Sequence, residues 1–179
     1  GYRGALDFTI SEPLVQTNSD GDIKHIADRK RLNSHKLIEE FMLAANISAA
    51  DFISQYAKEG VYRIHEHPES LKIQRLSQVL KNRGINWNGN IEDIENISEF
   101  ILKLNKRDDA PILNMLILQS MQRAEYSTLN KGHFGLKFDK YTHFTSPIRR
   151  YPDLLVHRII ISILNREEFD YEGLQLTLE

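Results

Sequence analysis

The spacing of apolar and polar residues predicts a chain made mostly of helices. Over residues 34–56, apolar positions recur at helical intervals and continue around the helix, which predicts burial on nearly all sides. Three more helices are predicted over residues 70–83, 94–105 and 111–126, and Gly84 suits the position just after the first of them. The apolar runs 111–121 and 154–164 are too short or too charged to span a bilayer, and both are predicted to form buried helices.

A short β component completes the predicted fold. Residues 5–10 and 24–27 have strand character, and Asp20-Gly21 between them is a hairpin turn signal. Turn chemistry explains the aspartates at this position better than metal binding does. Another short strand is predicted near residues 61–64. The expected fold class is therefore α+β, with about six helices and an N-terminal β-hairpin.

Composition adds limits to this fold. With 179 residues and 41% hydrophobic content, the chain fits one globular domain. It has no cysteine, which excludes disulfides and thiolate metal sites and agrees with a reducing compartment, so we expect a cytoplasmic protein without membrane association. Because the chain begins at Gly1 and has no signal-peptide pattern, we expect a segment of a longer protein.

Residues 141–158 carry the most informative chemistry. Ser146 is a good helix N-cap and Pro147 suits the first helical position, which would place Arg149 and Arg150 on the opening turn of a helix. Unpaired N–H groups, the helix dipole and two guanidinium groups would then favour an anion at one point, most plausibly a phosphate. The alternative is a capped surface helix whose arginines pair with nearby acids.

The charge distribution favours the anion site. The basic residues and histidines of this segment are His143, Arg149, Arg150, His157 and Arg158. Asp153 is its only acid, whereas the whole chain has a net charge of −2. Pro152 should kink the helix or restart it at Asp153. Asp153 lies four residues from both Arg149 and His157 and is expected to orient one of them.

Other polar residues have two interpretations each. Glu39 lies on the apolar helix 34–56 and, as a predicted buried carboxylate, is either a ligand contact, with Glu40 beside it, or one half of a salt bridge to a core arginine. His65-Glu66-His67 is explained better by a turn leaving a strand than by zinc. The aromatic ring of Phe134, between two glycines, either stacks on a base or fills the core.

Five sequence blocks resemble the RNase II and RNase R family of exoribonucleases. These blocks are RGALDF at residues 3–8, HKLIEEFMLAAN at 35–46, YRIHEHP at 62–68, KGHFGL at 131–136 and HFTSPIRRYPDLLVHR at 143–158. The resemblance implies a domain whose strands belong to a mixed sheet. It also implies a monomeric, Mg²⁺-dependent enzyme that holds single-stranded RNA in a channel and releases nucleoside 5′-monophosphates from the 3′ end.

The resemblance also assigns roles to individual residues. It implies that Arg149 lies against the scissile phosphate, with Arg150 beside it in the same phosphate-facing turn. Phe8 matches an aromatic residue that stacks on bases near the 3′ end, and Glu39 matches a glutamate that contacts the terminal nucleotides, with Glu40 next to it. The remaining expected RNA-binding residues are Ser146, His143 and Tyr141.

One feature of the family is missing from the sequence. The compact aspartate cluster of the form DxxxxxDxDD, which precedes the RGALDF block and binds Mg²⁺ in the family, does not occur here. We therefore interpret residues 1–179 as the C-terminal portion of a catalytic domain, with metal ligands and OB-fold domains expected upstream, and we expect this chain alone to be inactive. The alternatives are an RNA-binding module without hydrolytic activity and a helical scaffold without any RNA role.

Overall fold

The computed structural model describes residues 13–28, 32–87 and 93–178 of the chain. The elements in chain order are β1 (Pro13–Thr17), β2 (Ile23–Asp28), α1 (Asn33–Tyr56), β3 (Tyr62–Ile64), α2 (Ser70–Asn82), α3 (Ile94–Leu104), α4 (Ala110–Ser120), β4 (Glu125–Ser127), the 3₁₀ turn η1 (Phe134–Leu136), α5 (Tyr151–Asn165) and α6 (Leu174–Leu178). This content confirms the predicted α+β class. Of the described helices, none combines the length and the apolar character that crossing a bilayer requires.

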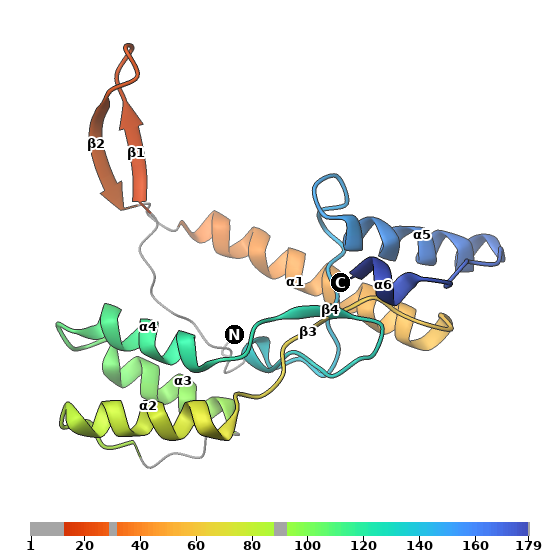
Figure 1. Cartoon of the computed structure of the whole chain (residues 1–179). Coiled ribbons are helices and arrows are strands. Elements are labelled where there is room, and N and C mark those ends of the chain that lie inside the picture. Colours follow the sequence, from red (N-terminus) through yellow and green to blue (C-terminus); the bar gives the residue numbers. More distant parts are fainter. Residues whose placement is uncertain (1–12, 29–31, 88–92, 179) are drawn as a thin grey trace.

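The N-terminal hairpin projects from the rest of the molecule (Figure 1). Strands β1 and β2 pair antiparallel, and the Asn18 side chain closes the turn by accepting the N–H groups of Asp20 and Asp22 at 3.0 and 2.8 Å. The predicted turn is confirmed, but the strand that pairs with β2 is Pro13–Thr17, while residues 5–10 lie outside the described part. The described strands form two separate two-stranded antiparallel sheets, where the resemblance implied a mixed sheet.

The described residues form two apolar cores. Helices α2, α3 and α4 pack together in one group, and the C-terminal half of α1 packs with β3 and α5 in the other (Figure 1). Leu80, Ile97 and Leu113 are fully buried in the first core, and Ile53 and Val156 in the second. Strands β3 and β4 and the segment 128–141 lie between the groups.

The predicted burial of the helices is wrong in part. The first half of α1 is exposed, with Ile38 at 57% and Phe41 at 63%, because no described element packs on it. Met115 of α4 and Leu164 of α5 are exposed as well. Helical periodicity reports which face of a helix is apolar, but it does not report what covers that face. Among these helices, therefore, only one side of each is buried.

Two helix ends also differ from the prediction. Helix α4 ends at Ser120 because the following residues turn back, and Glu125–Ser127 pairs with β3. Ser70 lies inside α2, whose N-cap position is Glu69. Gly84 has the predicted role, since its φ of +71° lets its N–H reach the carbonyl of Lys81 at 2.9 Å.

Candidate functional site

The two arginines lie on a tight turn that precedes α5, and we call residues 146–150 the arginine turn. The N–H groups of Arg149 and Arg150 both donate to the carbonyl of Ser146, at 3.3 and 3.1 Å. Helix α5 begins only at Tyr151, and Pro152 occupies its first turn, where a missing N–H has no cost. The predicted helix start at Ser146 is wrong, and the alternative restart expected at Asp153 lies two residues after the observed start at Tyr151. The backbone N–H groups of Arg149 and Arg150 therefore already have a hydrogen-bond partner. Only the guanidinium groups of these residues are left to bind an anion.

Asp153, in the first turn of α5, holds the two ends of the arginine turn together. Its side chain is completely buried, and Oδ1 accepts the N–H of Ser146 and Nη2 of Arg150, both at 2.8 Å. The prediction that Asp153 orients Arg149 or His157 is wrong, because a carboxylate in the first turn of a helix reaches back toward the residues that precede it. His157 instead forms a 2.9 Å hydrogen bond with the carbonyl of Phe144 and stacks on its ring.

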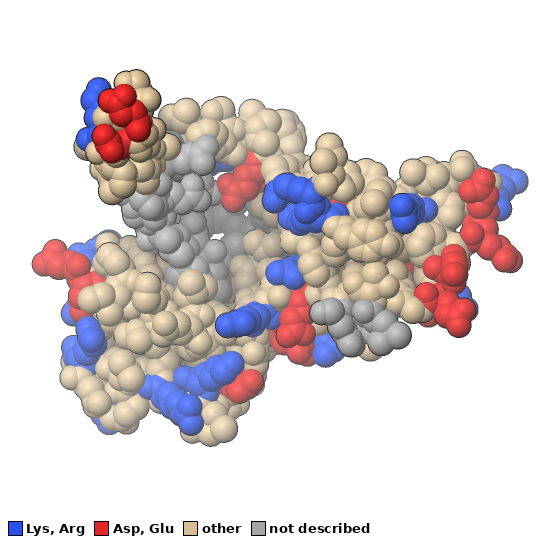
Figure 2. Space-filling model, turned by 45° about the horizontal axis from the view of Figure 1, so that its top comes forward, with Lys and Arg blue, Asp and Glu red and all other residues tan. Residues whose placement is uncertain are grey.

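The two arginines are in different environments. Arg150 is paired with Asp153, and its side chain is only 23% exposed. Arg149 is exposed, and within the described part the one hydrogen bond of its side chain is a long 3.4 Å contact to Ser146 Oγ. Lys and Arg side chains gather close to the start of α5 (Figure 2). Arg149 is thus the guanidinium that is available to an incoming anion.

Asn46 ties helix α1 to the segment that leads into the arginine turn. Its Nδ2 donates to the hydroxyl of Tyr141, and its Oδ1 accepts the N–H of Phe144, both at 2.9 Å. Asn46 and Tyr141 are both buried. A polar residue on the apolar helix therefore has its partners, and Tyr141 faces the protein interior. Sequence spacing did not identify Asn46 as part of the site, since its partners lie 95 and 98 residues away.

Glu39 and Glu40 lie in the first half of α1, before Asn46. Glu39 and Glu40 are exposed, so the prediction of a buried carboxylate at position 39 is wrong. Glu39 lies seven residues before Asn46, which places it on the same face of α1 and about 10 Å along the helix axis. Glu39 therefore lies on the side of α1 that contacts the segment before the arginine turn. Phe8 lies outside the described residues.

Histidine and tyrosine rings form a layer close to Arg150. His143 Nδ1 and the hydroxyl of Tyr126 share a hydrogen bond of 2.7 Å, and the ring of Tyr141 meets His143 and His133 edge-on. The pKa values of His133 and His143 are both lowered to about 4, chiefly by burial, and the charge of Arg150 contributes to the lowering at His143. Both imidazoles are therefore neutral at pH 7.

Tyr126 and Arg63 belong to this layer and were not predicted. The guanidinium of Arg63 lies 4.5 Å from the centre of the Tyr126 ring. The sequence pattern placed Tyr126 at the end of a helix, whereas it belongs to β4 and is paired with Arg63 of β3. Strand pairing between positions 63 residues apart brings these side chains together, and local periodicity carries no signal for it.

The histidine motif and the glycine loop have structural roles. His65 Nδ1 accepts the N–H of Gly135 at 2.8 Å, and its Nε2 is bonded to the carbonyl of Gln122, so both ring nitrogens are occupied. Phe134 is buried in the core, which decides between its two interpretations. Over the described ranges, no three side chains of the kind that ligate metals come together as a possible cation site.

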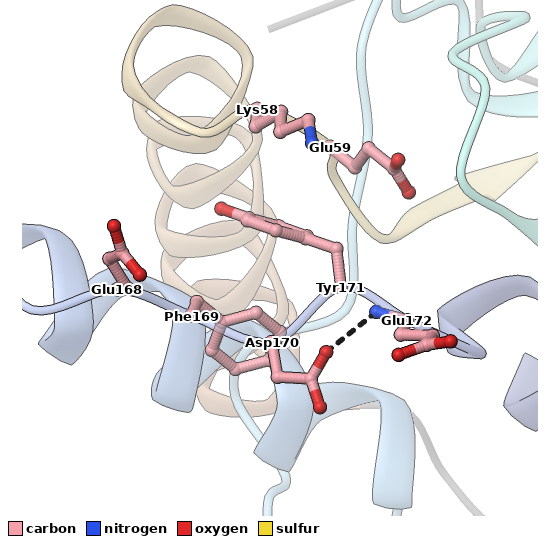
Figure 3. A pocket seen from close by; sticks show the side chains of 7 residues that line it. All are labelled: Lys58, Glu59, Glu168, Phe169, Asp170, Tyr171 and Glu172. Carbon is pink, nitrogen blue, oxygen red and sulfur yellow. Dashed lines mark hydrogen bonds between the residues drawn. The ribbon is translucent and has the colours of Figure 1, made fainter.

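A pocket of about 660 Å³ lies elsewhere, between the end of α1 and the segment after α5 (Figure 3). Its lining consists of Lys58, Glu59, Glu168, Phe169, Asp170, Tyr171 and Glu172. Four of these residues are acidic, and Figure 2 shows acidic side chains gathered where α5 ends. This charge disfavours a phosphate-bearing ligand, so the arginine turn is the better candidate site.

Comparison with curated proteins finds Ribonuclease R from several bacteria. Ribonuclease R of Escherichia coli (strain K12) is 40% identical over 167 residues, which are 93% of this chain and 20% of that protein. Ribonuclease R of Aquifex aeolicus (strain VF5) is 36% identical over 177 residues, which are 98% of this chain and 25% of that protein. The chain thus spans about a fifth to a quarter of these relatives.

Solved structures and a family model agree with this relationship. Mycoplasma genitalium RNase R in complex with double-stranded RNA superposes with a TM-score of 0.86 and 27% identity, covering 99% of this chain and 33% of that one. Yeast Ssd1, a pseudonuclease, has a TM-score of 0.70 and 26% identity, covering 83% of this chain and 19% of that one. The RNB domain model matches residues 2–166, and the chain therefore belongs to the RNB domain family.

Proposed function

We propose that this chain is the C-terminal portion of the RNB catalytic domain of a cytoplasmic, monomeric 3′→5′ exoribonuclease that degrades single-stranded RNA to nucleoside 5′-monophosphates. The observation that carries the proposal is the exposed Arg149 on a turn whose base is hydrogen-bonded to a buried carboxylate. The relatives named Ribonuclease R support the same activity. The exposed apolar side chains of α1 and α4 support the proposal that this chain is one portion of a larger domain, because such a surface suits contact with further parts of the protein.

In this proposal Arg149 stabilises the phosphate at which RNA is cleaved. A guanidinium presents N–H donors in a planar fork that matches two phosphate oxygens, and its charge offsets the negative charge that builds on them during hydrolysis. Arg150 adds positive potential at the same turn. Glu39 and Glu40 of α1 contact the terminal nucleotides, and a ribose hydroxyl is the group that distinguishes RNA from DNA for such a contact. Phe8 stacks on a base, and Ser146 and His143 complete the RNA-binding surface. Tyr141, which was expected to contact RNA, does not belong to this surface, because it is buried and its hydroxyl is bonded to Asn46.

Hydrolysis in this proposal also needs Mg²⁺, which would activate the attacking water. The part of the chain that the structure describes offers no set of ligands for it, so the residues present do not fit the ion. We propose that the ligands come from a part of the protein outside residues 1–179, and that the chain alone is therefore inactive. An RNA-binding module without hydrolysis is the second candidate, and the similarity to the pseudonuclease Ssd1 favours it.

The test measures hydrolysis and binding separately in the complete protein that contains this chain. A 5′-labelled single-stranded RNA is digested under single-turnover conditions by the unchanged protein and by the Arg149→Ala variant. We expect Arg149→Ala to lower the cleavage rate by about 10²–10³-fold, the usual effect of removing one donor to a developing negative charge. RNA affinity should fall much less.

Arg158→Ala is the matched control, since Arg158 is also an exposed arginine but lies within α5, outside the arginine turn. It should leave the cleavage rate unchanged. Equal rates for Arg149→Ala and the unchanged protein would refute the proposed role of Arg149. Salt-sensitive RNA binding without any mononucleotide release, in the unchanged protein with Mg²⁺, would favour the RNA-binding module.

A further inference from the structure

The base of the arginine turn contains an unusual arrangement of buried polar atoms. Asp153 is 0% exposed, and one of its oxygens holds both Ser146 and Arg150. Its second oxygen, Arg150 Nε and Thr145 Oγ1 are buried and have no hydrogen-bond partner among the described residues. A buried carboxylate is retained in a protein only when its environment or its function requires the charge. This arrangement therefore calls for an explanation beyond helix capping.

We infer that Asp153 is a positioning residue, which fixes the arginine turn so that Arg149 is held in place for the phosphate, and that Arg150 serves as the internal partner of Asp153 and not as a second phosphate ligand. This inference rests on the proposed function, because it assigns the roles within the same site. It separates two adjacent arginines that sequence resemblance treats as one phosphate-facing pair.

The geometry of the turn supports the positioning role. Asp153 bonds both the first and the last residue of the five-residue turn, so it closes the loop at its base. The backbone bonds from Arg149 and Arg150 to Ser146 close the same loop a second time. At the tip of the turn, the Ile148 side chain is fully exposed and makes no packing contact that would hold the turn in place. A loop closed twice presents the Arg149 backbone at a fixed point while its side chain stays in solvent.

The segment before the turn is anchored as well. Thr142 Oγ1 donates to the carbonyl of Val61, Asn46 accepts the N–H of Phe144, and His157 bonds the Phe144 carbonyl. These contacts come from the residue just before β3, from α1 and from α5, and they fix residues 142–144. Asp153 is the contact that extends this anchoring from residue 144 to the turn itself. Without it, the described contacts of the turn would be the hydrogen bonds within it and the bond from the Leu154 N–H to the Arg150 carbonyl, none of which reaches residue 146 from another element.

Charge separates the roles of the two arginines. The carboxylate of Asp153 lies 2.8 Å from the Arg150 guanidinium and offsets its positive charge at short range. A phosphate that approached Arg150 would also approach this carboxylate and would have to compete with it. No such carboxylate contact is found for Arg149 among the described residues. Arg149 therefore offers the larger attraction to a phosphate.

The experiment compares three variants of the complete protein: Asp153→Asn, Arg150→Gln and the double variant. Asp153→Asn leaves the partly buried Arg150 without its partner, and Arg150→Gln leaves the buried Asp153 without its partner. The loosened turn should lower kcat by about 10–100-fold with little change in KM, since misplacing a catalytic group by about 1 Å costs on the order of 10²-fold. The double variant replaces the ion pair by a neutral amide pair. We expect its kcat to return to within about 5-fold of the unchanged protein.

Hydrogen exchange at the Ser146 amide gives a readout that does not depend on activity. This amide donates to the buried carboxylate, so Arg150→Gln and Asp153→Asn should each accelerate its exchange, and the double variant should recover. Asp170→Asn, at an exposed acid after α5, is the matched control and should change neither quantity. If Asp153→Asn does not fold, Arg150→Gln and the double variant still carry the comparison.

Three results would overturn the inference. One is a kcat for Asp153→Asn or Arg150→Gln within twofold of the unchanged protein. Another is a double variant at least tenfold slower than either single variant, because Arg150 would then contact RNA itself. The third is unchanged exchange at the Ser146 amide in Arg150→Gln. Failure of the proposed function is distinguished by Arg149→Ala, which would then cleave RNA at the normal rate while the exchange results still reported on the turn.

Discussion

Replacing Asn46 by alanine should loosen the segment that leads into the arginine turn. Asn46 is 3% exposed and bonds the Tyr141 hydroxyl and the Phe144 N–H at 2.9 Å each. Loss of the acceptor for the Phe144 N–H costs about 1–3 kcal/mol, and loss of the bond to Tyr141 costs about 0.5–1.5 kcal/mol. Because the Phe144 amide is only partly buried, we expect a total of about 1.5–4 kcal/mol in the free energy of local opening.

Hydrogen exchange measures this free energy where the contact is made. A loss of about 1.5–4 kcal/mol corresponds to an acceleration of roughly 10- to 700-fold at the Phe144 amide, since each 1.4 kcal/mol is a factor of ten. Peptides from α3, in the other core, should exchange as before. Cleavage of RNA should slow in parallel, because the segment carries the arginine turn.

Two comparisons make the interpretation specific. Tyr141→Phe removes only the hydroxyl bond and should cost about 0.5–1.5 kcal/mol, with a smaller acceleration at Phe144. Ser48→Ala changes an exposed position of the same helix and should stay within about 0.5 kcal/mol of the unchanged protein. The reasoning is refuted if Asn46→Ala accelerates exchange at Phe144 by less than threefold, or no more than Ser48→Ala does.

Two further predictions concern pH and the isolated chain. The pKa values of His133 and His143 are lowered to about 4 in the folded state, so between pH 6.5 and 4 the unfolded chain binds more protons than the folded chain does. The contribution of the two neutral histidines to stability is therefore complete above about pH 6.5 and is lost as the pH falls toward 4. Because both rings are partly solvated, we expect each histidine to lower the free energy of unfolding by about 1–2 kcal/mol between pH 7 and pH 4.5, measured by urea unfolding at the two pH values. His143→Phe should show a smaller loss of stability over this range, and an unchanged loss would contradict the assignment. The isolated chain with Mg²⁺ and labelled single-stranded RNA should release no mononucleotides, and release that survives purification and is abolished by Arg149→Ala would contradict this.

The elements that the sequence predicted well are those with local signals. The hairpin turn at Asp20-Gly21 and the helix end at Gly84 depend on residues that tolerate positive φ, and both are found. Strand β4 was missed because Glu125–Ser127 is short, follows a helix directly and pairs with a strand 63 residues earlier. Burial of α1 was overestimated, since an apolar face predicts a contact surface but not the element that covers it.

The candidate site was predicted in chemistry and missed in detail. Ser146-Pro147 is a signature of helix starts, but the same pair begins a turn, and only the position of Pro152 in the chain distinguishes the two. The partner of Asp153 was sought at a spacing of four within a helix, whereas its partners lie before the helix begins. The contacts of Asn46 and Tyr126 join distant parts of the sequence and have no local signature.

The relative position of Arg149 and Glu39 follows from how the turn is anchored. Asn46 of α1 bonds residue 144, and Asp153 of α5 bonds residue 146, so the arginine turn is tied to both helices through short polar contacts. Helices α1 and α5 also share an apolar core that includes Ile53 and Val156. Since Glu39 lies two turns from Asn46 on one continuous helix, any motion of α1 that displaced Glu39 would pull on residue 144 as well. The distance between Glu39 and Arg149 is therefore set by α1 and by the anchored turn, and not by a flexible loop. A fixed distance is what two groups need if they are to contact adjacent parts of one RNA end, as proposed.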